Sequence, residues 1–137
     1  MSPDELTKKV EEIKAAGNER FLKGDYTQAK ALYTDALSLN PNIVAIYSNR
    51  AICELKLEQY GLAIADATKA IELDATFAKA YYRRACAHLA ILDPKAALPD
   101  LKMVVKLDPR NAQVKMQLDA TSKLVRRLEF EKAIRVE

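Results

Sequence analysis

Five basic and amide side chains in this sequence have the types and the spacing of an anion-binding site. Lys14 and Asn18 are four residues apart, as are Lys79 and Arg83, so each pair shares one face if its segment is helical. Asn49 stands between the two pairs. Lysine and arginine give carboxylates charge-assisted hydrogen bonds worth about 1.5–3 kcal/mol each, and an asparagine amide donates without adding charge. Brought together, these side chains would hold two neighbouring carboxylates, such as those of a chain-terminal aspartate.

The other residues that commonly carry chemistry do not form a catalytic or metal site in this sequence. The 137 residues include a single histidine, His88, and two cysteines, Cys53 and Cys86, without the C-x-x-C spacing of a metal or redox motif. There are three glycines and no glycine-rich phosphate loop. We therefore predict no enzyme activity for the chain itself, no cofactor and no metal, and free thiols at both cysteines.

The charge and the hydropathy pattern limit the class of partner and the location. The net charge is +3, which is small for a domain that binds nucleic acid. The chain lacks a run of about 18 apolar residues, and its first residues are charged and polar, so we expect neither a membrane span nor a signal peptide. These features predict one compact domain in the cytoplasm, with the nucleus as an alternative, that binds neither membrane nor nucleic acid.

A repeat of 34 residues predicts the elements that position the five side chains. At this offset Gly17 aligns with Ala51 and Ala85, and apolar residues recur around them at helical spacing. Each copy contains two helical segments, and the 34-residue period is typical of tetratricopeptide repeats. The five polar side chains fall in the first helix of each copy. Three helix pairs are expected after a polar lead of residues 1–9, at residues 10–43, 44–77 and 78–111.

The predicted fold is all-α, a right-handed α-solenoid of three helix pairs with a C-terminal capping helix. One pair cannot bury both of its faces, so the pairs must stack, and stacking brings the first helices side by side along a concave groove. Residues 112–137 are predicted to form the cap, because Val114, Leu118 and Val125 share an apolar face. Pro99 lies inside the second helix of the third pair, where its missing N–H predicts a kink.

The polar residues of this groove resemble the dicarboxylate clamp of tetratricopeptide co-chaperones, a family that binds the C-terminal EEVD tails of Hsp90 and Hsp70. The resemblance rests on all five positions, in the contexts KAAGN, YSNRA and KAYYRRA. It implies that Lys14, Asn18 and Asn49 hold the terminal carboxylate of the tail, while Lys79 and Arg83 reach its acidic side chains. It fits either Hsp90 or Hsp70 as the partner.

Residues next to the clamp have less defined roles. Three are expected to line the groove, and the first two of them to form an apolar pocket for the ligand residue before the terminal aspartate: Ile52, Leu55 and Tyr82. Arg50 and Arg84 adjoin clamp residues, and they either attract an acidic tail from the rim or are simply solvated.

Two longer stretches, YGLAIADATKAIELD and VKMQLDATSKLVRRLEFEKAI, resemble the N-terminal module of the serine/threonine protein phosphatase 5 family. This resemblance covers about residues 10–135 and implies that the parent protein carries a phosphatase domain after this module. It also implies that the module targets the phosphatase to chaperones and blocks its active site.

Two other functions compete with this interpretation. The groove could accept an internal segment of a partner instead of a free C-terminus, as in tetratricopeptide scaffolds. The basic last helix could contact nucleic acid, but Glu129, Glu131 and Glu137 alternate with its basic residues and disfavour that function.

Overall fold

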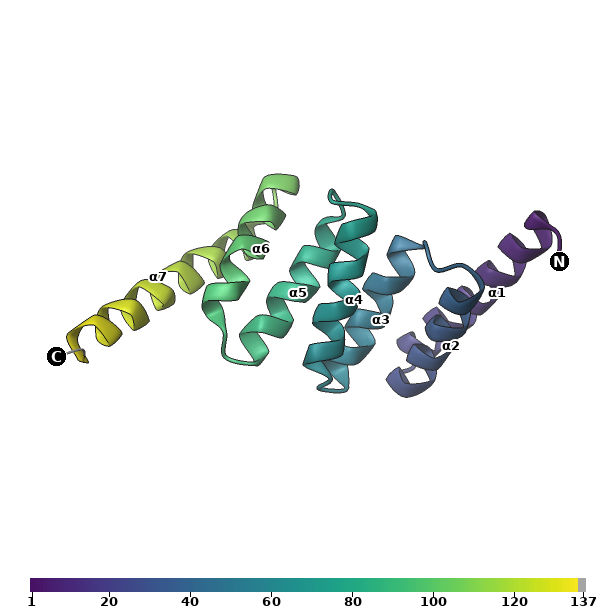
Figure 1. Ribbon diagram of the computed structural model, residues 1–137, viewed down its shortest axis with the longest axis horizontal. Coiled ribbons are helices and arrows are strands. Elements are labelled where there is room, and N and C mark those ends of the chain that lie inside the picture. The colour runs from purple at the N-terminus through teal and green to yellow at the C-terminus, as the bar shows by residue number, and fades with distance from the viewer. Residues whose placement is uncertain (136–137) are drawn as a thin grey trace.

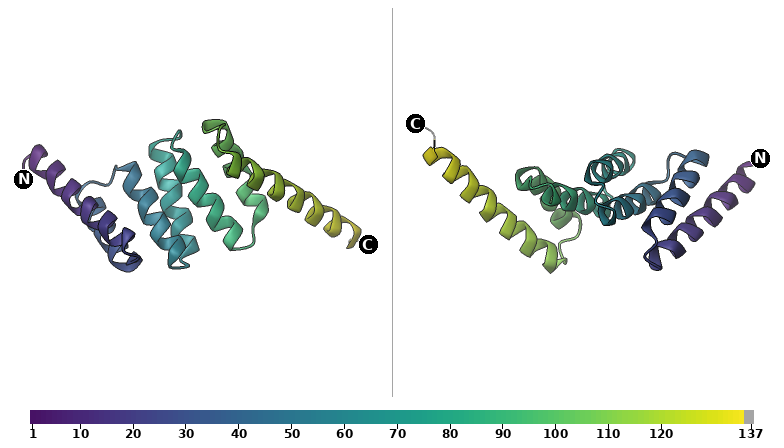
Figure 2. Two further views of the ribbon diagram at one scale, coloured as in Figure 1. Left: turned by 180° about the vertical axis from the view of Figure 1, so that it is seen from behind. Right: turned by 90° about the horizontal axis from the view of Figure 1, so that it is seen from below.

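The computed structural model describes residues 1–135, which fold into seven α-helices without a β-strand (Figure 1). Consecutive helices form hairpins that stack side by side, with the two termini at opposite ends of the stack (Figures 1 and 2). The predicted all-α solenoid of helix pairs is confirmed. The helices are α1 (Pro3–Leu22), α2 (Tyr26–Leu39), α3 (Val44–Lys56), α4 (Tyr60–Leu73), α5 (Ala78–Ala90), α6 (Pro94–Leu107) and α7 (Ala112–Arg135).

Helix α1 begins at Pro3, so most of the expected polar lead is helical. Ser2 caps this helix by accepting a hydrogen bond from the amide of Glu5 at 3.2 Å. Proline suits the first turn because an N–H there would have no partner within the helix. At the other end, the segment predicted to form the cap is helical in α7 as far as Arg135, and Glu137 lies outside the described residues.

Small residues let the helices of each pair pack closely. The aligned residues Gly17, Ala51 and Ala85 of the first helices are all buried. The second helices contribute alanines that have no exposed surface, also 34 residues apart: Ala29, Ala63 and Ala97. A larger side chain at these positions would push the paired helices apart, since protein interiors are close-packed.

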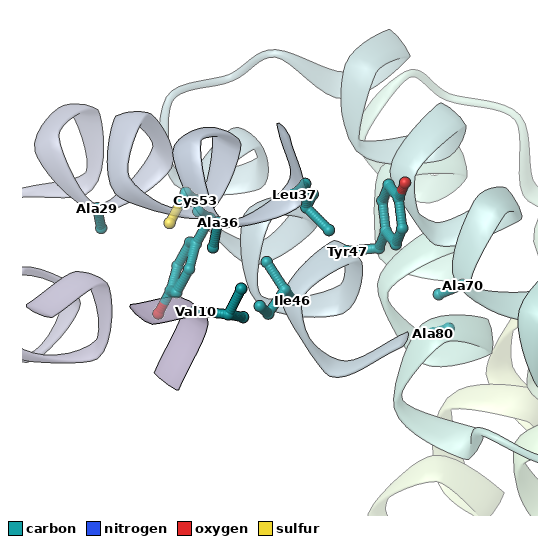
Figure 3. Packing of buried hydrophobic residues seen from close by; sticks show 10 residues of the cluster. Val10, Ala29, Ala36, Leu37, Ile46, Tyr47, Cys53, Ala70 and Ala80 are labelled. Atoms are coloured by element: carbon teal, nitrogen blue, oxygen red, sulfur yellow. The ribbon is translucent and has the colours of Figure 1, made fainter. Parts of the chain in front are cut away.

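The largest core cluster continues from the first helix pair to the third, as Figure 3 shows. It includes Val10 of α1, Ile46 of α3 and Ala80 of α5, all of which are buried. Each pair thus buries its remaining apolar face against the next pair, which is how a stacked repeat gains stability. This shared core places α1, α3 and α5 in a fixed order along the stack.

Two arginines 34 residues apart form ion pairs that hold α3 and α5, the first helices of the second and third pairs, against neighbouring helices. Arg50 of α3 donates to both carboxylate oxygens of Asp66 on α4, at 2.6 and 2.7 Å, and to the hydroxyl of Thr34 on α2 at 3.2 Å. Arg84 of α5 makes the equivalent bonds to Asp100 of α6, at 2.7 and 2.8 Å. The expectation that these arginines face the groove rim or are solvated is therefore wrong, because the fold already pairs both guanidinium groups.

Another acid, Glu54, is buried beside the first of these ion pairs. Its side chain is 3% exposed, and its Oε2 lies 3.4 Å from Nζ of Lys30 on α2. Burial, reinforced by the neighbouring Asp66 carboxylate, raises the pKa of Glu54 to about 8 from its ordinary value of 4.5. The folded state thus favours the protonated acid. The stability that this group contributes is complete below its ordinary pKa and is lost as the pH rises through about 8.

The third pair and the cap share a second core cluster. Helix α6 continues without interruption through Pro99, so the kink predicted there does not break the helix. Val114 and Leu118 of α7 pack in one cluster with Leu101 and Val104 of α6. The C-terminal half of α7 extends beyond the stack (Figure 1), and its Phe130 and Ile134 are exposed.

Both cysteines are free thiols, as expected, and burial raises the pKa of Cys53 to about 11. Along residues 1–135, we find no helix whose length and apolar character would suffice to span a bilayer. The same residues contain no group of three or more histidine, cysteine or acidic side chains suited to hold a metal ion.

We predict that a chain ending at Asn111, which lacks α7, is less stable by at least about 2 kcal/mol. This truncation exposes Leu101 and Val104, and burying one aliphatic side chain is worth about 1.5–3 kcal/mol. Thermal melts with light scattering measure the loss. A chain ending at Leu128 is the matched control, because it removes mainly exposed residues and should keep the midpoint. Equal midpoints for both truncations would show that α7 is not a cap.

We also predict that Glu54→Gln stabilises the protein more at pH 8 than at pH 5. Glutamine resembles the protonated acid, which the fold favours, and wild type loses that form as the pH rises. The stability gain should increase by about 1 kcal/mol or more between the two pH values. Urea unfolding measures it, with exposed Glu72→Gln as the control. The same gain at both pH values would contradict the raised pKa of Glu54.

Candidate anion-binding site

The side-chain amides of Asn18 on α1 and Asn49 on α3 approach each other. Nδ2 of Asn49 is 3.5 Å from Oδ1 of Asn18, a long contact. The same oxygen accepts a second, short hydrogen bond of 2.5 Å from the hydroxyl of Tyr33 on α2. No hydrogen bond from Nδ2 of Asn18 is found within residues 1–135, so both of its N–H bonds are available to a ligand.

An apolar cavity of about 180 Å³ opens beside the asparagine pair. Ile52 of α3 lines it, one turn away from Asn49. Leu55 does not, because it packs instead against the buried cluster of Ala51 and Ala63. The remaining lining residues of this cavity come from α1 and α2 as well as α3: Asn18, Phe21, Leu22, Tyr33 and Asn49. The arrangement suits one apolar side chain next to a polar group that the amides would bind.

A second cavity, of about 260 Å³, lies between α5, α6 and the start of α7. Lys79, Tyr82 and Arg83 line it, so the structure brings together the basic pair and the tyrosine that were selected from the sequence. The guanidinium of Arg83 lies 5.6 Å from the centre of the Tyr82 ring. Asp108 lines the same cavity and adds a carboxylate beside the basic and amide side chains selected from the sequence.

Three cations of the candidate site have no acidic partner in the described part of the chain. Within residues 1–135, no salt bridge or hydrogen bond joins Lys14, Lys79 or Arg83 to a carboxylate. Nε of Arg83 is also buried and has no hydrogen-bond partner among these residues. A buried N–H of this kind carries a desolvation penalty, which an anionic ligand would offset. By contrast, Arg50 and Arg84, which follow Asn49 and Arg83 in the sequence, each form an ion pair within the fold.

The sequence analysis did not include Tyr33 among the site residues, yet its hydroxyl contacts a candidate ligand-binding amide. Burial raises the pKa of Tyr33 to about 12, so the hydroxyl stays protonated and can donate at physiological pH. Lys14 lies one helical turn before Asn18 and on the same face of α1. The five residues therefore come from the first helix of all three pairs, as the repeat predicts.

The comparison with known protein families agrees with this geometry. Residues 14–76 match a family model described as tetratricopeptide repeat. The chain is 49% identical over 124 residues to serine/threonine-protein phosphatase T of Aspergillus oryzae, and 42% identical over 131 residues to serine/threonine-protein phosphatase 5 of Mus musculus. These matches cover 90% and 96% of this chain but 26% of each relative, so the chain spans about a quarter of the length of both.

Solved structures similar to this chain include two RPAP3 domains. The first tetratricopeptide domain of Spaghetti (RPAP3), bound to the HSP90 peptide SRMEEVD, superposes with a TM-score of 0.82 at 29% identity, covering 86% of this chain and 96% of that domain. The second domain of human RPAP3, in complex with the HSP70 peptide SGPTIEEVD, gives a TM-score of 0.80 at 30% identity, covering 85% and 98%. The sequence similarity to the phosphatase 5 family and the fold similarity to peptide-binding domains were both expected and are confirmed.

Proposed function

The chain belongs to the tetratricopeptide repeat family, and from this premise we propose that it binds the acidic C-terminal tail of a chaperone, ending in EEVD. The observation that carries the proposal is the set of unpaired cations. Lys14 on α1, and Lys79 and Arg83 on α5, have no acidic partner in residues 1–135, and Nε of Arg83 is buried without an acceptor there. A ligand with several carboxylates supplies the acceptors that these groups lack.

The terminal aspartate of such a tail has two carboxylates close together, and the unpaired donors of the groove would stabilise both. The two carboxylates repel each other unless donors surround both. In the proposed complex, Lys14, Asn18 and Asn49 hold the terminal carboxylate, and Lys79 and Arg83 reach acidic side chains of the tail. Only the end of a chain has this second carboxylate, so the clamp would distinguish a C-terminus from an internal acidic segment.

The apolar cavity beside the asparagines supports the same ligand. A valine precedes the terminal aspartate in EEVD, and a cavity lined by Phe21 and Ile52 offers a place for its side chain. The two RPAP3 domains that resemble this chain were solved with peptides that share the EEVD ending. We therefore propose Hsp90 or Hsp70 as the partner, with the apolar cavity reading the residue before the aspartate.

We further propose that the parent protein is a serine/threonine phosphatase in which this module targets the enzyme and restrains it. Support comes from the similarity to two phosphatases that are about four times longer than the matched region. The chain itself would contribute binding and no catalytic group. A tail in the groove would relieve the restraint only if it binds the open state of the parent more tightly than the closed state.

We predict that the isolated chain binds the peptide SRMEEVD with a dissociation constant on the order of micromolar, about −8 kcal/mol. A short tail that is disordered before binding loses conformational entropy when it is ordered. This cost offsets much of the contact energy, so tighter binding is not expected. Arg83→Ala and Lys79→Glu should each weaken binding at least about tenfold, because a desolvated carboxylate loses a charged donor. Calorimetry measures the affinity, and circular dichroism checks that both variants remain folded.

Matched controls for these two variants are Lys69→Glu on α4 and Arg126→Ala on α7, which make the same charge changes on exposed residues. They should bind within about twofold of wild type, since exposed charges at a distance are screened by salt. Amidating the peptide C-terminus should weaken wild-type binding by about tenfold or more. If the amidated peptide binds as well as the free acid, the clamp is the wrong mechanism, and a groove for an internal segment takes its place.

We predict that removing residues 1–137 from the full-length parent raises its basal phosphatase activity, and that adding the EEVD peptide to the intact parent does the same. The reason is that the module would cover the active site until the tail binds. Assays with a small phosphate ester measure both effects, and Arg83→Ala in the intact parent should abolish the response to peptide. Equal activity with and without the module would refute the restraint.

A further inference from the structure

We propose that Tyr33 is a positioning residue of the candidate site, because its hydroxyl holds the Asn18 amide with the N–H groups turned toward an anionic ligand. This inference rests on the proposed function of the groove. It adds a residue from a second helix, α2, to a site whose other members all lie on first helices. The role differs from packing, since it depends on one oxygen atom of the side chain.

The two contacts at Oδ1 together set the orientation of the Asn18 amide. An asparagine amide can rotate by half a turn with little change in shape, which exchanges its donor and its acceptor. At 2.5 Å, the Tyr33 hydroxyl donates to Oδ1 of Asn18, and Nδ2 of Asn49 approaches the same atom. The rotated amide would turn its N–H groups toward the N–H of Asn49, and the Tyr33 hydroxyl would have to accept instead of donate. The amide would then present its oxygen to the groove. A bound carboxylate would then meet an acceptor instead of a donor.

The backbone of α1 is adapted to admit the Tyr33 ring. A Cβ atom at Gly17 would lie 2.7 Å from Cε1 and 3.0 Å from Cδ1 of Tyr33, closer than van der Waals contact allows. The tyrosine is fully buried with its ring across this glycine. Glycine at position 17 therefore permits the hydroxyl to reach Asn18, the next residue along the helix.

Comparison within the chain separates this role from the general packing of the repeat. The residues 34 and 68 positions after Tyr33 are Ala67 and Leu101, and those aligned with Gly17 are both alanine. All of these positions are buried, so the fold accepts aliphatic residues there. Only the first repeat combines glycine with tyrosine. It is also the only repeat with an asparagine at the position of Asn18, where the others have Ile52 and Cys86.

The direct test is Tyr33→Phe, which removes the hydroxyl and keeps the ring that fills the core. We expect the variant to bind the free-acid peptide SRMEEVD about fivefold to tenfold more weakly, while binding of the amidated peptide changes less than about twofold. In the Asn18→Ala background the same substitution should have almost no further effect, because the group that it orients is absent. Circular dichroism and thermal melts establish that each variant is folded.

Tyr47→Phe is the matched control. Its hydroxyl also donates a partly buried hydrogen bond, of 2.7 Å, but to the backbone carbonyl of Pro41, away from the asparagine pair. This variant should lose a similar amount of stability and keep wild-type affinity. If Tyr33→Phe and Tyr47→Phe bind the free acid equally well, or if Tyr33→Phe weakens binding equally in the Asn18→Ala background, Tyr33 has only a structural role.

A measurement without ligand separates this inference from the proposed function. In NMR spectra of the free protein, Tyr33→Phe should shift and broaden the side-chain amide signals of Asn18, and leave those of Asn40 and Asn111 in place. Both control asparagines accept backbone N–H bonds elsewhere in the fold. Unchanged Asn18 signals would overturn the positioning role. A wild-type protein that binds neither peptide would reject the proposed function, while these signals still decide the role of Tyr33.

Discussion

The close approach of paired helices at small residues is the constraint on which the rest of this structure depends. Gly17, Ala51 and Ala85 occupy the same place in three successive pairs, and all are buried. Their small size lets each pair form a thin layer with two apolar faces, and each layer must then stack on the next. The stacking sets the spacing of α1, α3 and α5. A ligand that touches all three helices therefore meets side chains at distances that the core determines.

Two arginines form ion pairs inside the stack, while the residue before each of them remains available for binding. Arg50 and Arg84 join successive helices through carboxylates that are almost fully buried, and removing one partner of such a pair is strongly destabilising. Asn49 and Arg83 immediately precede these arginines, about 100° around the helix, and so face a different direction. The same turn of helix therefore carries one residue that fixes the helix and one that is available to a ligand. Rigid anchoring of this kind limits the ordering that binding requires.

The candidate site combines two environments that suit different parts of one peptide. Near α1 and α3, an apolar cavity adjoins neutral amides, whereas near α5 and α6 a wider cavity contains Lys79 and Arg83. Asp108 also lines the second cavity, so a carboxylate lies there beside the two cations.

The sequence by itself determined the period, the helical hairpins and the five clamp candidates, because each follows from spacing along one helix or from comparison between copies. It did not determine which residues meet between helices. The partners of Arg50 and Arg84, the packing of Leu55 against Ala51 and Ala63, and the bond from Tyr33 to Asn18 all depend on the rotation and separation of neighbouring helices. A 3.6-residue periodicity specifies which face of a helix is apolar, but not which atom of the next helix lies opposite it. Only the tertiary structure decided these contacts, since they are set by the packing of side chains that are distant in the chain.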